Sequence, residues 1–231
     1  MDHQRILVVA AHPDDEVLGC GGFISKYSRE SEISVLWIAE GVSTRFPADQ
    51  IESRACVEAI ARRTEDAIRA VKRLGVSNYK FLDHPCGRLD SIPIIELNKH
   101  VEEYIQEIQP SLIMTHSAVD CNNDHRLVHR SVMMASRPGG AVDFVEAVMS
   151  FEVLSSTEWS FGEEFRPNFF LELDKEQIAA KTSAMLEYKE EVRDAPHPRS
   201  VPGIKTQAKY RGQQIAKEFA EAFNIVRTTR L

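Results

Sequence analysis

The most constraining feature of the sequence is an apolar run that ends abruptly in a histidine and three carboxylates. Residues 6–10 are all apolar, which is typical of a strand buried on both faces inside a parallel sheet. His12, Asp14, Asp15 and Glu16 follow at once. In open parallel sheets the functional residues gather just beyond the carboxyl ends of the strands, so this turn is a candidate site.

Strand-like and helix-like segments alternate along the chain. This alternation predicts an α/β fold, a Rossmann-like three-layer sandwich with a mostly parallel central sheet. No shift in composition divides the sequence, so we expect a single domain over residues 1–231. The predicted strands cover residues 6–10, 33–39, 79–82, 112–115, 148–154 and 169–173. The predicted helices cover residues 17–27, 51–74, 93–109, 126–136, 175–188 and 205–223.

Bulk composition narrows the class of protein. The net charge of −7 argues against a nucleic-acid partner. No apolar run is long enough to cross a bilayer, and the first predicted strand begins too near Met1 to leave room for a signal peptide. The four cysteines form no C-x-x-C pair, which favours reduced thiols in a cytoplasmic protein. Composition does not determine the oligomeric state, and a homo-oligomer is compatible with it.

A second cluster of polar residues follows the predicted strand at residues 112–115, and it includes His125. Because the ends of parallel strands share one edge of the sheet, His12, Asp15 and His125 could meet around one metal ion. Two imidazoles and a carboxylate suit Zn²⁺ with a fourth position open to water. Zinc lowers the pKa of bound water to about 7, and Asp14 could then accept its proton. The alternative is that Asp14 and Asp15 only cap the next helix.

The sequence resembles the LmbE-like (PIG-L) zinc-dependent N-deacetylases. The resemblance rests on residues 12–16 (HPDDE), on residues 18–22 (LGCGG), and on residues 122–125 (NNDH) in place of the usual His-Pro-Asp-His. Arg62, three residues before Glu65, also matches in spacing. The resemblance implies one zinc ion per chain on His12, Asp15 and His125, Asp14 as general base, and hydrolysis of an N-acetyl group from an amino sugar.

One position departs from the family pattern. Asn122 replaces a histidine that polarises the scissile carbonyl or protonates the amine. An amide can donate to an oxyanion but does not titrate near pH 7. His197, in a proline-rich loop, could supply the proton instead, or it could be an ordinary surface histidine. His116 is expected to be structural, and Asp124 could orient a ligand ring.

Substrate contacts are less defined. The resemblance places Arg62 near the substrate, although a solvated helix arginine is the alternative. A nucleotide-linked sugar would need a cation at its phosphates, and Arg62, Arg137, Arg166 or Arg199 could provide it. The expected partner is a small N-acetylated amino sugar, either free, nucleotide-linked, lipid-linked or part of an antibiotic intermediate. A lipid substrate is the least favoured, because no amphipathic anchor is evident.

Three other functions can be compared with the sequence pattern. A dinucleotide-binding domain is rejected, because the glycines at residues 19–22 lie well after the strand and the turn itself carries carboxylates that would repel a pyrophosphate. A metal-dependent hydrolase of another amide or ester is the serious alternative. A non-catalytic sugar-binding protein is the third, and it would need no open metal position beside a free carboxylate.

Overall fold

The computed structural model describes residues 4–139 and 141–229, and seven strands within them form one sheet. The strands are β1 (Arg5–Ala10), β2 (Glu32–Ala39), β3 (Asn78–His84), β4 (Leu112–His116), β5 (Ala147–Phe151), β6 (Phe169–Leu173) and β7 (Phe219–Thr228). The α-helices are α1 (Asp15–Tyr27), α2 (Arg54–Arg73), α3 (Ile94–Ile108), α4 (Asn123–Ala135), α5 (Lys175–Met185) and α6 (Val201–Gln213).

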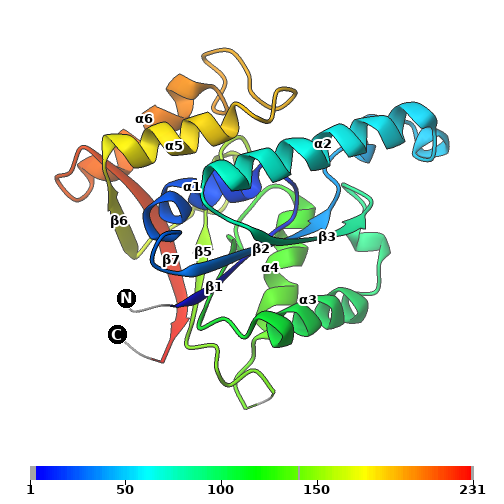
Figure 1. The fold of residues 1–231 in the computed structure, drawn as a ribbon, viewed down its shortest axis with the longest axis horizontal. Helices are drawn as coiled ribbons and strands as arrows, with labels where there is room; N and C mark the ends of the chain where they lie inside the picture. The colour runs from blue at the N-terminus through cyan, green and yellow to red at the C-terminus, as the bar shows by residue number, and fades with distance from the viewer. Residues whose placement is uncertain (1–3, 140, 230–231) are drawn as a thin grey trace.

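The sheet has the order β3-β2-β1-β4-β5-β7-β6. The first five strands in this order pair in parallel, whereas β7 runs antiparallel to both of its neighbours. Figure 1 shows α1, α2, α5 and α6 on one face of the sheet and α3 and α4 on the other. An apolar core lies on each face. The predicted three-layer α/β sandwich is therefore confirmed.

The strand order reverses beside β1, which pairs with β2 on one side and with β4 on the other. At such a switch point the connections leave the sheet toward opposite faces, and a crevice opens beyond the carboxyl ends of the two strands. The turn after β1 and the loop after β4 both enter this crevice. The fold thus brings together the two polar segments that the sequence singled out.

The last predicted helix is wrong beyond residue 213. Helix α6 ends at Gln213, and Ala216 adopts a positive φ of 57° that reverses the chain. Residues 219–223 form the buried first half of β7, which pairs with β6, and the second half of β7 pairs with β5. Residues 219–223 (FAEAF) suit either structure on local propensity, and pairing with β6 selects the strand, because tertiary context often overrides propensity.

The glycines at residues 19–22 shape the first helix. A Cβ on Gly22 would lie 2.3 Å from Cδ1 of Leu173, so any larger residue there would have to displace the Leu173 side chain where α1 approaches β6. Cys20 interrupts the helix with φ −145° and ψ 23°. The buried carboxylate of Glu221 accepts hydrogen bonds beyond this kink from the backbone N–H of Gly22 (2.8 Å) and Phe23 (2.7 Å). The glycine cluster therefore allows α1 to pack closely against the sheet, and Glu221 caps the part of the helix beyond the kink.

No helix among the described residues combines the length and apolar character needed to cross a membrane. The four cysteines are free thiols, and three of them are buried.

Candidate metal centre and active site

Asp15 lies between two histidines at the crevice. His12 is in the turn after β1, Asp15 begins α1, and His125 is in the first turn of α4. Oδ2 of Asp15 is 3.3 Å from Nδ1 of His12 and 3.3 Å from Nε2 of His125. One ligand atom from each of the three buried side chains lies within 4.8 Å of the other two. The structure therefore brings the three predicted metal ligands together.

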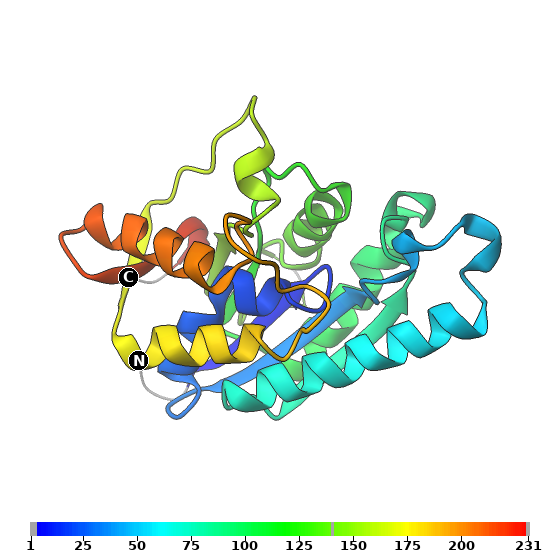
Figure 2. The same cartoon turned by 90° about the horizontal axis from the view of Figure 1, so that it is seen from above.

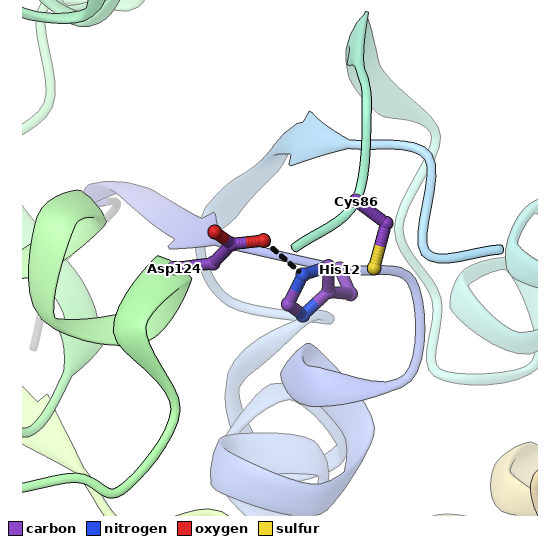
Figure 3. A group of neighbouring side chains, drawn as sticks. All are labelled: His12, Cys86 and Asp124. Carbon is purple, nitrogen blue, oxygen red and sulfur yellow. Dashed lines mark hydrogen bonds and ion pairs between the residues drawn. The ribbon is translucent and has the colours of Figure 1, made fainter. Parts of the chain in front are cut away.

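Each histidine has a carboxylate on its other ring nitrogen. Nε2 of His12 lies 3.0 Å from Oδ2 of Asp124, as Figure 3 shows, and Nδ1 of His125 lies 3.2 Å from Oδ2 of Asp120. Such partners fix the tautomer, because the nitrogen that faces the carboxylate carries the proton. The other nitrogen of each ring, Nδ1 of His12 or Nε2 of His125, faces Asp15 and would ligate a metal ion after losing its proton.

Asp120 was not singled out by the sequence for this role. Burial would raise the pKa of its carboxyl, but hydrogen bonds from His125, Ser156 and Thr157 and the charge of His125 lower it to about 2. For His125 burial lowers the pKa, because it disfavours the charged imidazolium. The charge of Asp15 and hydrogen bonds with Asp120 and Asp15 outweigh this effect and raise the pKa to about 9. A site that holds a proton this tightly is electrostatically suited to a cation. The donor set therefore fits a divalent metal ion.

His116 is a structural histidine, as expected from its position. Its Nε2 accepts a hydrogen bond of 2.8 Å from the backbone N–H of Ala11. The ring stacks on His125 with a centroid distance of 4.0 Å. Because Nε2 is engaged by the backbone of the β1 turn, His116 supports the wall of the site.

Asp14 directs its carboxylate into the cavity and does not cap α1. It occupies the N-cap position but makes no capping hydrogen bond through its side chain. Its φ is 114°, a costly conformation for a residue with a Cβ. The backbone N–H of Asp14 donates to Oε2 of Glu16 (3.1 Å), and Glu16 is held in turn by Trp37 (2.8 Å) and Tyr188 (2.6 Å). Burial, together with the charges of Asp15 and Glu191, raises the pKa of Asp14 to about 7 despite the opposing charges of Arg63 and Arg199.

Three arginines converge on a buried carboxylate beside Asp14. Glu191, in the segment after α5, accepts hydrogen bonds from Arg45, Arg63 and Arg199, the last at 2.8 Å. Nη1 of Arg199 also lies 3.3 Å from Oδ2 of Asp14, and Nη1 of Arg63 lies 3.6 Å from the same oxygen. Glu191 thus fixes two guanidinium groups against the carboxylate of Asp14.

The structure places Arg62 outside the cavity and its neighbour Arg63 inside it, which agrees with the alternative of a solvated helix arginine. The side chain of Arg62 is 57% exposed, and its nearest acidic partner is Glu190 at 3.8 Å. The side chain of Arg63 is only 5% exposed, and Nη1 donates to the carbonyl of Pro13 (3.1 Å). Periodicity could have distinguished them, since Arg63 lies four residues from both Ala59 and Ala67, on the buried face of α2.

A cavity of about 200 Å³ joins these groups. Figure 2 shows the chain between β5 and β6 projecting from the body of the molecule, and residues 153–156 of this segment form one wall. The three predicted metal ligands and Asp14 line this cavity, whereas the supporting carboxylates Asp120 and Asp124 do not. The polar lining residues are His12, Asp14, Asp15, Thr44, Arg45, Arg63, Cys86, Asn122, His125, Ser155, Ser156, Glu191 and Arg199.

The remaining predicted residues divide into two groups. Asn122 lines the cavity, and its Oδ1 accepts the hydrogen bond of the Asp124 N–H (2.9 Å) as the N-cap of α4, which leaves its NH₂ group as a donor. Arg199 also lines the cavity. His197 does not. Its ring packs edge-on against Trp159 at 6.1 Å, and Nδ1 accepts from the backbone N–H of Arg199.

Comparison with known families fits this geometry. The family model described as PIG-L, GlcNAc-PI de-N-acetylase, matches residues 7–136, which is more than half of the chain. The chain belongs to the PIG-L family. The resemblance drawn from the HPDDE and NNDH segments is thereby confirmed.

Individual PIG-L relatives are distant. The 2'-N-acetylparomamine deacetylase of Streptomyces fradiae is 26% identical over 150 residues, which are 59% of this chain and 53% of that protein. The chain therefore spans about half the length of that relative. The uncharacterized deacetylase YaiS of Escherichia coli K12 is 24% identical and covers 80% of this chain and 90% of its own.

A solved structure supports the assignment of the fold. The N,N'-diacetylchitobiose deacetylase of Pyrococcus horikoshii superposes with a TM-score of 0.79 at 19% identity, covering 98% of this chain and 85% of that one. At this level of identity the comparison concerns the fold.

Proposed function

We propose that this PIG-L protein is a zinc-dependent hydrolase that removes the N-acetyl group from an amino sugar or a sugar conjugate, nucleotide-linked sugars included. One observation carries the proposal: two carboxylate-supported histidines flank Asp15, and the carboxylate of Asp14, which is outside this ligand set, lies in the same cavity. The deacetylase activities of the relatives are consistent with it. We further propose that residues 1–231 act as one deacetylase domain in the cytoplasm.

His12, Asp15 and His125 would hold the zinc ion. Bound there, zinc would act as a Lewis acid toward the acetyl carbonyl oxygen and would lower the pKa of a water molecule. Two imidazoles and one carboxylate are a common ligand set in catalytic zinc sites, and they leave the fourth coordination position open for water or substrate.

In this proposal Asp14 is the general base. A pKa of about 7 matches the proton affinity that a base needs near neutral pH. Asp14 accepts a proton from the attacking water, whose oxygen bonds to the carbonyl carbon. It returns that proton to the nitrogen as the C–N bond breaks, which yields acetate and the free amine. The proposal assigns this second transfer to Asp14 because His197 does not line the cavity.

Asn122 and the arginines complete the assignment. The NH₂ group of Asn122 is free to donate to the developing oxyanion, since its Oδ1 is engaged by α4. Arg63 and Arg199 hold Asp14 in place, and Arg199 also lines the cavity at 24% side-chain exposure. We propose Arg199 as a contact for the sugar hydroxyls or for a phosphate of the substrate.

The deciding experiment is an acetate-release screen. Zinc-loaded protein is incubated with free, nucleotide-linked and carrier-linked N-acetyl sugars, and with N-acetyl amino acids and acetyl esters, and the products are identified by mass spectrometry. We expect deacetylation within the sugar panel and its loss in Asp14→Asn. Release only from amino acids or esters would favour another metal-dependent hydrolase. Sugar binding with no release from any compound would favour a binding protein.

A further inference from the structure

Cys86 belongs to a second group of potential metal ligands that surrounds His12. Figure 3 shows His12 with Cys86 and Asp124, which come from the turn after β1, the loop after β3 and the first turn of α4. One ligand atom from each lies within 4.8 Å of the other two, and all three residues are buried. Cys86 also lines the cavity beside the site with Asp15 and His125.

The loop that carries Cys86 is held in position by hydrogen bonds. The backbone N–H of Cys86 donates to Oε1 of Glu40 (2.7 Å) and to Oγ of Ser43 (3.1 Å). The next residue, Gly87, donates its N–H to Oδ2 of Asp124 at 2.6 Å. The loop therefore fixes the backbone of Cys86, and its next residue holds the carboxylate of Asp124. The three potential ligands are already in place without a metal ion.

The two ligand groups share His12, and they use opposite sides of its ring. Nδ1 lies 3.3 Å from Asp15, whereas Nε2 lies 3.0 Å from Asp124. A neutral imidazole offers one lone pair, because its other nitrogen carries a proton. A metal ion bound with Asp15 takes Nδ1 and leaves the proton on Nε2, while an ion bound with Asp124 takes Nε2 and leaves the proton on Nδ1. Neutral His12 can serve only one of the two ions.

We propose that His12, Cys86 and Asp124 form an alternative site for thiophilic divalent metal ions, and that its occupation withdraws His12 from the site with Asp15 and His125. Thiolate sulfur selects soft cations, whereas imidazole and carboxylate accept borderline ones. Binding releases the thiol proton to solvent and moves the imidazole proton from Nε2 to Nδ1. The proposal concerns metal choice and does not depend on the deacetylase activity.

Cadmium is the probe for this site. Zinc-loaded protein is titrated with Cd²⁺ while thiolate-to-cadmium charge-transfer absorption and zinc release to an indicator are followed together. The background is Cys121→Ser, because Cys121 is the exposed thiol. We expect the absorption band and zinc release to rise in parallel, and Cys86→Ser to lose the band while still binding zinc.

A second measurement uses the protein without any substitution. Alkylation followed by peptide mapping should show that cadmium protects Cys86, whereas Cys121 reacts with or without the metal. This readout remains valid if Cys86→Ser fails to fold. A band that persists in Cys86→Ser, or alkylation of Cys86 unaffected by cadmium, would overturn the site. A band that grows without zinc release would overturn the mutual exclusion.

Discussion

Nε2 of His12 lies 3.0 Å from Oδ2 of Asp124, although 112 positions separate the two residues in the chain. The contact forms because β1 and β4 are adjacent parallel strands and both residues follow the carboxyl ends of these strands. It directs Nδ1 of His12 toward Asp15. The carboxylate thus acts on a metal ion indirectly, through the tautomer and the orientation of the ring.

Replacing Asp124 should therefore weaken metal binding without removing a ligand. For Asp124→Ala we expect zinc affinity to fall by about 10- to 100-fold, the usual effect of losing such a partner. Competition with a chromophoric chelator measures the change. Asp90→Ala, at an exposed position, is the control, and equal affinities for the two variants would contradict the orienting role.

Removal of a ligand itself should be more severe. We expect the purified protein to hold one zinc ion per chain, and His12→Ala and His125→Ala to lose it. Elemental analysis after gel filtration gives the stoichiometry. His129→Ala is a suitable control, because His129 contacts the carbonyl of His116 and belongs to neither ligand group. Full occupancy in both ligand variants would show that the assignment is wrong.

Asp14→Asn should keep zinc but lose catalysis. A missing general base lowers the rate by about 10²- to 10⁴-fold. Since the base must be deprotonated and the pKa of Asp14 is about 7, the rate of the unsubstituted enzyme should fall as the pH drops through this value. Any fall with pH that remains in Asp14→Asn should report the zinc-bound water alone. Lost zinc with substantial activity would instead make Asp14 a ligand.

Arg62 and Arg63 form a matched pair for a stability measurement. Removing one partner of a buried ion pair costs about 3–5 kcal/mol, and we expect the lower end for Arg63→Ala because Arg45 and Arg199 remain beside Glu191. Arg62 is exposed, and Arg62→Ala should change the free energy of unfolding by less than about 0.5 kcal/mol. Urea unfolding compares them, and similar losses would refute the assignment of Arg63 to the site.

Asn122 can be tested separately from its capping role. Asn122→Ser retains a side-chain oxygen that can cap α4 but removes the amide donor, and the rate should fall by about 10²-fold or more. The acid limb of the pH–rate profile should not move, because the amide does not titrate. His197→Ala should leave the rate and the profile intact. A shifted basic limb in that variant would instead identify His197 as the acid for the leaving amine.

Local sequence patterns account for the frame of the fold and the metal ligands. Residues 6–10 are apolar enough to be buried on both faces, and the polar residues that follow must then lie at the sheet edge. The same reasoning holds for the strand that precedes His125. Parallel pairing places these ends together wherever the strands are neighbours, so His12, Asp15 and His125 could be predicted without coordinates.

The tertiary structure alone determines which side chains surround these ligands and Asp14, orient them and shift their pKa values. Glu191 meets Arg63 across 128 positions, and Cys86 approaches His12 from the loop after β3. Asp120, in the loop after β4, supports His125 in the first turn of α4. Residues 219–228 form a strand because β6 pairs with residues 219–223 and β5 pairs with residues 223–228. Sequence periodicity reports which face of an element is buried, but it carries no information about which distant side chain will lie against that face. That choice is made when the elements pack.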